Sequence, residues 1–230
     1  MIMQNLSELS CITGKNLKLI LGIKNPEVYL SRYLLNKKIN KIEKGKYTTQ
    51  DNVLTYCTQI ISPSYLSFHS ALYYYGFTTQ LPLKETVAIR FIKKELENIK
   101  FIRIGSKSFF GYERIKYNGY DLFIATREKL LIDCVQYQNQ SIQINELLDL
   151  LKSNLNKEMI ISYLKRINNL NLIKRIGYLL SLINIDIYAD FKSKIENNRK
   201  YILLNKNNSK TKKFNIKWKI NINEDLNYDN

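Results

Sequence analysis

Signals for short helices followed by a hairpin constrain the fold of the first fifty residues. Apolar residues between positions 6 and 12 recur at helical spacing, and residues 15–22 repeat that spacing until Gly22 ends the pattern. Pro26 suits the first position of a third helix, which we expect to run to about Lys37. The sequence therefore predicts three short helices before residue 40.

A basic hairpin is expected directly after these helices. Ile39, Ile42 and Tyr47 anchor two short extended pieces around Gly45, and glycine permits the positive φ angle of a tight turn. Short helices followed by a hairpin are the layout of a winged helix-turn-helix, in which the helix after the turn enters the major groove of DNA. We therefore predict a winged helix-turn-helix over residues 1–49. Modules of this kind also bind proteins, so a protein-interaction module is an alternative.

Polar side chains on the third predicted helix and cations around it are candidate DNA contacts. We expect Ser31, Arg32 and Asn36 to read base edges, with Tyr29 as support. Lysines near the helix and in the hairpin would bind phosphate without reading sequence. These expected phosphate contacts are Lys24, Lys38, Lys41, Lys44 and Lys46. Asn25, the predicted N-cap of the helix, completes the set of predicted DNA-binding residues.

The net charge of +16 is spread over the whole chain. There are 36 Lys and Arg residues against 20 Asp and Glu residues. A positive field of this kind raises the rate of encounter with nucleic acids and other polyanions. A solvated basic surface in a lysine-rich proteome is the alternative explanation.

The sequence lacks the features of a membrane or secreted protein. No stretch approaches the roughly 18–20 consecutive apolar residues that span a bilayer. Residues 1–9 lack the basic start and the apolar run of a signal peptide. We expect a cytoplasmic protein without a membrane partner.

Residue types that carry catalysis or bind metals are sparse. The three cysteines are far apart and His69 is the single histidine, so neither a disulfide framework nor a zinc site is predicted. We interpret His69 as a packed or capping residue. The sequence contains no glycine-rich phosphate loop and no carboxylate set that we can assemble into a nuclease site. We expect no enzymatic activity, no metal and no cofactor, and a nucleic-acid enzyme is an alternative.

Strand and helix signals alternate in the middle of the chain. The runs 85–92 and 100–105 are apolar and extended in character. The Asn-Gly pair at 118–119, between two alternating segments, is the strongest hairpin signal in the chain. Thr126 can cap the helix that follows. The Glu-Lys pair at 128–129 is expected to form salt bridges or caps.

The last third combines a helical pattern with two strand signals. Residues 143–197 contain groups of apolar residues at helical spacing, which is typical of a small bundle. Residues 201–204 predict a strand, and residues 214–222 alternate apolar with polar side chains, which predicts a half-buried strand. We interpret the basic pairs at 165–166 and 174–175 as a solvated face in preference to a second DNA contact.

Together these signals predict an α+β protein. The N-terminal winged helix-turn-helix, residues 1–49, is followed by a linker or helix over residues 50–61. Residues 62–230 are expected to form a mixed α/β domain with a small helical bundle.

Segments spread in order over most of the chain carry a family resemblance. Residues 67–76, SFHSALYYYG, fit the pattern S-x-x-S-A-L-x-x-x-G. Residues 125–133, ATREKLLID, fit the pattern A-x-x-E-K-x-x-x-D, with Arg127 where proline is common. Further similar segments are residues 43–47, 110–124, 172–180 and 217–221. In these segments the chain resembles the AbiEi-type antitoxins, which are also described as predicted transcriptional regulators of viral defence systems.

The resemblance implies a two-domain repressor. Its winged helix would bind double-stranded DNA at inverted repeats in its own promoter, with two copies of the chain on the DNA. Its second domain would counteract a cognate toxin of the nucleotidyltransferase type, which is generally encoded by the adjacent gene. The antitoxin and the toxin need not form a stable complex. A standalone regulator without a toxin is the alternative.

Overall fold

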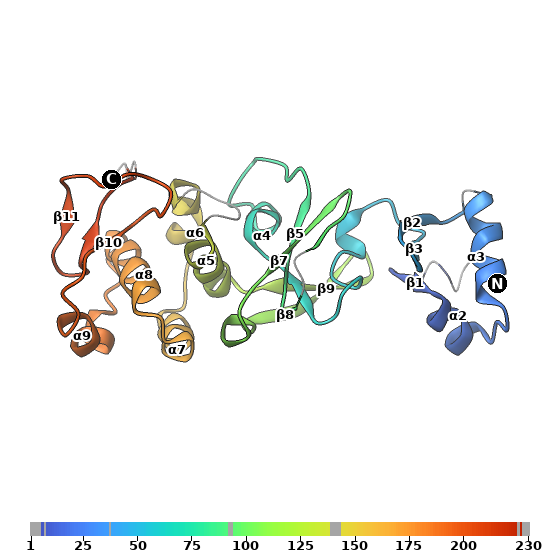
Figure 1. Ribbon diagram of the computed structural model, residues 1–230, viewed down its shortest axis with the longest axis horizontal. Coiled ribbons are helices and arrows are strands. Elements are labelled where there is room, and N and C mark those ends of the chain that lie inside the picture. The colour runs from blue at the N-terminus through green and yellow to red at the C-terminus, as the bar shows by residue number, and fades with distance from the viewer. Residues whose placement is uncertain are drawn as a thin grey trace. The chain divides into compact units, whose positions relative to one another are not determined.

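The computed structural model describes residues 6, 8–36, 38–91, 94–138, 144–224 and 226, and these form helices and three sheets (Figure 1). This mixture confirms the predicted α+β fold. None of the helices in the described part of the chain is long and apolar enough to cross a membrane.

The chain divides into two compact units. The first is made of Met1–Leu66, Leu83–Ile104 and Glu113–Ile124, and the second of Ser67–Pro82, Gly105–Tyr112 and Ala125–Asn230. Residue 49 is not a boundary between these units. The division into domains at that residue therefore stays a prediction from the sequence.

The first unit begins with short elements around a small core of their own, and we call them the N-terminal module. In chain order they are β1 (Ile12–Thr13), α2 (Gly14–Leu21), α3 (Pro26–Leu35), β2 (Asn40–Glu43) and β3 (Lys46–Thr48). Strand β3 pairs antiparallel with both β1 and β2, which gives the sheet order β1-β3-β2. The buried residues that connect these elements are Leu6, Ile12, Leu17, Leu30 and Ile39.

Local signals explain where α2 and α3 begin and end. Thr13 caps α2, because its hydroxyl accepts a hydrogen bond from a backbone N–H of the first turn. Gly22 ends α2 in the left-handed conformation, with φ of 63°. Pro26 begins α3 as predicted, but the helix ends at Leu35, and Lys37 lies outside the described residues.

The first predicted helix is wrong at its C-terminal end. Ile12 lies in β1 and pairs with Tyr47 of β3. Thr13 has φ of −129° and ψ of 159°, because a capping residue is extended, so the chain is not helical here. Within the predicted span of residues 6–12, residue 7 lies outside the described residues.

The hairpin predicted between the third helix and residue 49 is confirmed. Gly45 has φ of 79° between β2 and β3, and the pairing register shifts between Lys41 and Glu43. After it, Val53–Thr55 forms a single 3-10 turn where the sequence predicts a linker or a helix.

Strands between residues 64 and 125 form a larger sheet with the order β6-β7-β5-β4-β9-β8. The strands are β4 (Ser64–Leu66), β5 (Glu85–Ile89), β6 (Lys94–Glu95), β7 (Ile99–Arg103), β8 (Tyr112–Tyr117) and β9 (Tyr120–Ala125). Strands β5 and β7 run parallel, as do β4 and β9. The predicted hairpin turn between β8 and β9 is confirmed, with φ of 49° at Asn118 and 86° at Gly119.

The second unit holds most of the helices. They are α4 (Phe68–Tyr74), α5 (Arg127–Gln136), α6 (Leu148–Lys152), α7 (Lys157–Ile167), α8 (Leu170–Leu182) and α9 (Tyr188–Glu196), with 3-10 turns at Ser106–Ser108 and Ile144–Leu147. A small sheet of β10 (Ile202–Leu203), β11 (Phe214–Asn215) and β12 (Ile220–Asn221) has the order β10-β12-β11. Thr126 caps α5 as predicted, by accepting from the Lys129 N–H.

The strand predicted over residues 214–222 is wrong, because the segment is broken by a turn. Only Phe214–Asn215 and Ile220–Asn221 are strands, and they pair with each other across the turn. The side chain of Asn215 accepts a hydrogen bond from the Trp218 N–H, and Lys219 has a positive φ of 52°. The turn directs Trp218 into the core, where it is fully buried.

The interpretation of residues 174–175 as a solvated face is also wrong. Lys174 and Arg175 are buried in α8. The Lys174 ammonium donates to the Asn198 side chain and the Lys200 carbonyl, and the Arg175 guanidinium donates to the carbonyls of residues 203 and 204. The two cations therefore donate hydrogen bonds to acceptors in residues 198–204, which follow α9.

Candidate nucleic-acid interface

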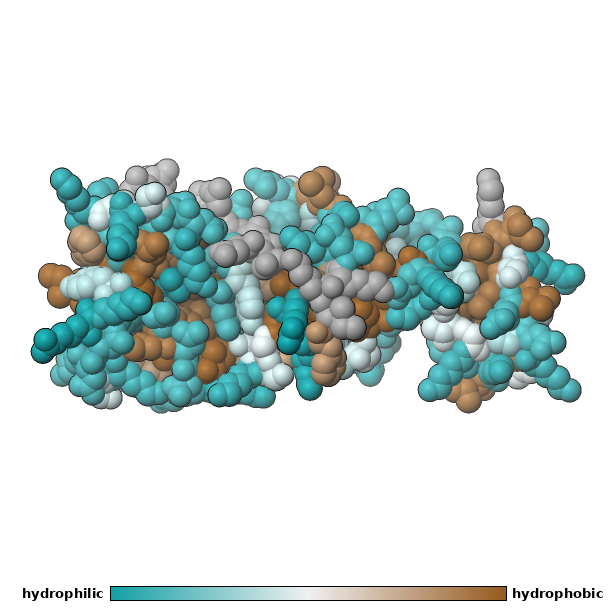
Figure 2. All heavy atoms as spheres, viewed as in Figure 1, coloured by the Kyte–Doolittle hydropathy of each residue, from teal (hydrophilic) through white to brown (hydrophobic). Residues whose placement is uncertain are grey.

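Helix α3 presents one face to its own core and the other to solvent. Leu30 is buried, whereas Ser31, Arg32 and Asn36 are exposed as expected for base readers. Val28 and Leu35 are also exposed, by 69% and 84%. Figure 2 shows apolar residues on the surface over α3 beside hydrophilic ones. The outward face of α3 is therefore mixed, not purely polar.

The candidate base readers differ in what already occupies their polar atoms. The Ser31 hydroxyl donates to the Glu27 carbonyl one turn back, at 2.9 Å. Asn36 is the C-cap of α3 through its backbone N–H. Arg32 makes no ion pair or side-chain hydrogen bond with any described residue, so its five donors are available to a ligand.

Aromatic rings pack beside the exposed face of α3. Tyr29 stacks on Tyr33 with ring centroids 5.3 Å apart. The Lys38 ammonium lies 5.9 Å from the centroid of the Tyr33 ring. Two of the predicted contacts, Tyr29 and Lys38, thus both pack against one aromatic residue.

A shallow hollow brings four predicted contacts together. It has a volume of about 440 Å³. Its lining residues are Ile23, Lys24, Asn25, Val28, Tyr29 and Arg32. Asn25 occupies the predicted N-cap position without a side-chain cap hydrogen bond, so its amide remains able to bind a ligand.

The lysines of the hairpin are not equivalent. Lys41 and Lys44 are exposed. The Lys46 ammonium forms an ion pair with Glu43 at 2.9 Å and donates to the Ile60 carbonyl at 2.5 Å. The structure therefore leaves two hairpin ammonium groups for phosphate and engages the third within the fold.

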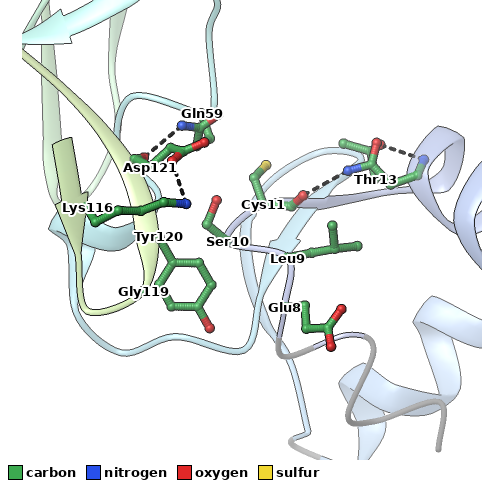
Figure 3. Close-up of a pocket in the computed structure, with 11 residues that line it drawn as sticks. Glu8, Leu9, Ser10, Cys11, Thr13, Gln59, Lys116, Gly119, Tyr120 and Asp121 are labelled. Atoms are coloured by element: carbon green, nitrogen blue, oxygen red, sulfur yellow. Dashed lines mark hydrogen bonds and ion pairs between the residues drawn. The ribbon is translucent and has the colours of Figure 1, made fainter. Parts of the chain in front are cut away.

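A second cavity in the first unit is lined by groups poorly suited to catalysis (Figure 3). It has a volume of about 330 Å³ between residues 8–16, Gln59 and the β8–β9 turn. The Asp121 carboxylate there is ion-paired with Lys116 at 2.7 Å, and hydrogen bonding from Lys116 lowers its pKa. Burial raises the pKa of the Cys11 thiol. An ion-paired carboxylate and a protonated thiol make a poor base and a poor nucleophile.

The second unit contains a buried ion pair at the position where the sequence predicts salt bridges or caps, but its carboxylate partner was not predicted. Lys129 pairs with Asp133, and Ser67 donates to the same carboxylate at 2.9 Å. All three side chains are fully buried, so they offer no reactive surface to a ligand in solution. The i,i+4 spacing of Lys129 and Asp133 was the available signal. Glu128 is a cap, as the sequence predicts for this pair, because it accepts from the Asn156 N–H at the start of α7.

No set of three His, Cys, Asp or Glu side chains able to hold a metal ion occurs within the described ranges.

Comparison with known proteins yields a fold and no family. No protein-family model matches the chain, and no curated protein matches it. The crystal structure of the RV2827C protein from Mycobacterium tuberculosis is similar, with a TM-score of 0.64 and 11% sequence identity. The match covers 95% of this chain and 89% of that chain. At this identity the likeness concerns the fold alone, and the resemblance to AbiEi-type antitoxins stays a prediction from the sequence.

Proposed function

We propose that this protein is a cytoplasmic, sequence-specific DNA-binding repressor whose residues 1–49 act as a winged helix-turn-helix. One observation carries the proposal: Arg32, on the exposed face of α3, pairs with no residue that the structure describes, and the hairpin of the same module has exposed lysines. Helix α3 has ten residues and is about 15 Å long. An α-helix with its side chains is about 10–12 Å in diameter, so it fits a major groove about 12 Å wide.

We assign base reading and phosphate binding to different side chains of the module, according to their polar groups. Arginine contacts guanine through two parallel hydrogen bonds, so Arg32 is the residue best suited to read a base. Exposed ammonium groups at Lys24, Lys41 and Lys44 supply charge that binds phosphate of any sequence. We assign affinity to the lysines and sequence preference to α3.

We extend the proposal to an antitoxin role on the strength of the family resemblance. The ordered set of similar segments supports a repressor that binds inverted repeats in its own promoter as two copies and counters a nucleotidyltransferase-type toxin. The identity of the adjacent gene tests this extension. A neighbouring gene without such a toxin would leave a standalone regulator.

A protein-interaction module is the second candidate, and the exposure of Val28 and Leu35 on α3 favours it. Apolar side chains contact thymine methyl groups in DNA, but they also form the centre of protein interfaces. The salt dependence of binding distinguishes the DNA-binding function from the protein-binding function. Protein binding through an apolar patch survives high salt, whereas binding to DNA weakens steeply.

Fluorescence anisotropy with DNA from upstream of the gene tests the main proposal. We expect the native duplex to bind at least about a thousandfold more tightly than a scrambled duplex of equal length. Equal, salt-sensitive binding of both duplexes would reduce the interaction to nonspecific attraction and contradict the proposal.

A further inference from the structure

The segment from Asn197 to Asn223 has an extreme charge pattern. It contains eight Lys and Arg residues and no Asp or Glu. It includes all three strands of the β10-β12-β11 sheet and the loop 206–213 that precedes β11. A segment of one charge sign on one small sheet is the electrostatic footprint expected of a polyanion-binding surface.

Among these eight cations, Lys206, Lys217 and Lys219 are engaged within the fold. The Lys219 ammonium donates to carbonyls at the end of α9, and that of Lys206 donates to the Gln136 carbonyl. Lys217 forms an ion pair with Asp186 at 2.8 Å. In contrast, four exposed cations form no ion pair with any residue that the structure describes: Arg199, Lys200, Lys210 and Lys212.

Two aromatic rings lie exposed on the same sheet. Tyr201, which precedes β10, is 41% exposed, and Phe214 of β11 is 52% exposed. Their ring centroids are 5.4 Å apart, with the planes at 85°. Figure 2 shows apolar residues at the surface over β11, among hydrophilic ones. Exposure of two large rings needs a reason, because burial of their apolar surface is favourable.

The strand order explains why the rings meet. Strands β10 and β11 are the two edges of the small sheet, with β12 between them. Phe214 pairs in register with Asn221 of β12, and Ile202 pairs with Ile220 on the other side. The rings of Tyr201 and Phe214 therefore contact each other across the central strand, and the basic loop leads directly into one of them.

We propose that Tyr201 and Phe214, with the four exposed cations named above, form a binding surface for single-stranded nucleic acid. Unpaired bases stack on exposed aromatic rings while lysines follow the phosphate backbone. A duplex would give this surface charge contacts only, because its base faces are stacked inside the helix. The surface lies in the second unit and uses no residue of α3, so it is separate from the duplex interface proposed above.

The test uses the full-length chain and fluorescently labelled oligonucleotides of about 12 nucleotides, within the span of known single-strand sites. The probes are oligo-dT, oligo-rU and a mixed-sequence duplex of the same length. We expect Phe214→Leu to weaken binding of the tighter single-stranded probe by about tenfold, which is the scale of one base stack. Duplex binding should remain unchanged. The relative affinities of the two single strands identify the preferred sugar.

Matched variants separate stacking from charge and from misfolding. Phe91→Leu removes another exposed phenylalanine beside a cation, Arg90, and should leave all binding unchanged. Phe214→Trp should keep the affinity that Phe214→Leu removes, because the aromatic surface is retained. Lys212→Gln should weaken both probe types and Lys107→Gln neither. Unchanged single-strand binding in Phe214→Leu, or equal weakening on single strand and duplex, would overturn the proposal.

Discussion

Lys44 and Lys46 flank Gly45 at the tip of one hairpin, yet their ammonium groups have different roles. Lys44 is exposed, whereas Lys46 is held by Glu43 and by the Ile60 carbonyl. A lysine already engaged in the fold must break these interactions before it can bind phosphate. The sequence predicts both as phosphate contacts, because composition does not reveal which ammonium group has an internal partner.

Lys44→Ala should therefore weaken specific and scrambled duplexes alike. The slope of log K against log salt should fall by about 0.9 for each phosphate that is no longer neutralised. Lys46→Ala should change this slope less and should lower the urea midpoint of unfolding instead. A larger change in the salt slope for Lys46→Ala than for Lys44→Ala would show that the internal partners of Lys46 do not decide its role.

The buried pair of Lys129 and Asp133 gives a prediction about stability. Asp133→Asn leaves the Lys129 ammonium without its carboxylate in a fully buried site, and we expect a loss of about 3–5 kcal/mol in the free energy of unfolding. Adding Lys129→Met should recover most of this loss, because the introduced amide can still accept the hydrogen bond from Ser67. Urea unfolding measures both variants, and equal midpoints for the single and the double variant would contradict the assignment.

The pH dependence of this pair has a definite sign. Burial lowers the pKa of Lys129 below the usual lysine value of 10.5, so the folded chain holds this proton less tightly than the unfolded chain. Between the lowered pKa and 10.5 the unfolded state binds more protons, and the contribution of Lys129 to stability rises with pH.

At the scale of elements, Gly177 of α8 makes room for Trp218. A Cβ atom added at Gly177 would lie 2.2 Å from two atoms of the Trp218 ring. Gly177→Ala should destabilise the fold by about 1–3 kcal/mol through overpacking, although alanine is the better helix former. Because Trp218 is the single tryptophan, its fluorescence emission should also change.

Gly14→Ala at the start of α2 is the matched control. A Cβ atom there would meet Pro26 at 3.6 Å, an ordinary van der Waals distance. This variant should unfold at a midpoint equal to or above that of the parent chain and leave the tryptophan emission unchanged. Equal stability of the two variants would contradict the packing of Trp218 against α8.

Elements with a local signal were predicted well, and those that depend on distant partners were not. The turns at Gly45 and Asn118-Gly119 need positive φ angles, which the residue types supply directly. The alternation over residues 214–222 failed because Trp218 belongs to a turn and packs against a distant helix. The two-residue strand β1 was missed because its partner strand β3 is distant in the chain, with Ile12 opposite Tyr47.

At the scale of the whole molecule, the charge of +16 bears on two proposed surfaces that need different partners. The predicted DNA-binding residues all belong to the N-terminal module or its immediate flanks, and the structure exposes Arg32, Lys41 and Lys44 there. The aromatic pair of the second unit could not be predicted, because no local pattern indicates that Tyr201 and Phe214 meet. Charge alone would make both surfaces bind any polyanion, so side-chain chemistry must supply the selectivity.

The central claim, that α3 reads base sequence, is tested most directly by Arg32→Ala. Anisotropy titrations of this variant should be run with the native upstream duplex and its scrambled counterpart at one salt concentration. If Arg32 contacts a base, the native duplex loses about 1–3 kcal/mol of binding free energy and the scrambled duplex changes little. Equal weakening on both duplexes would contradict the claim and make Arg32 a phosphate contact.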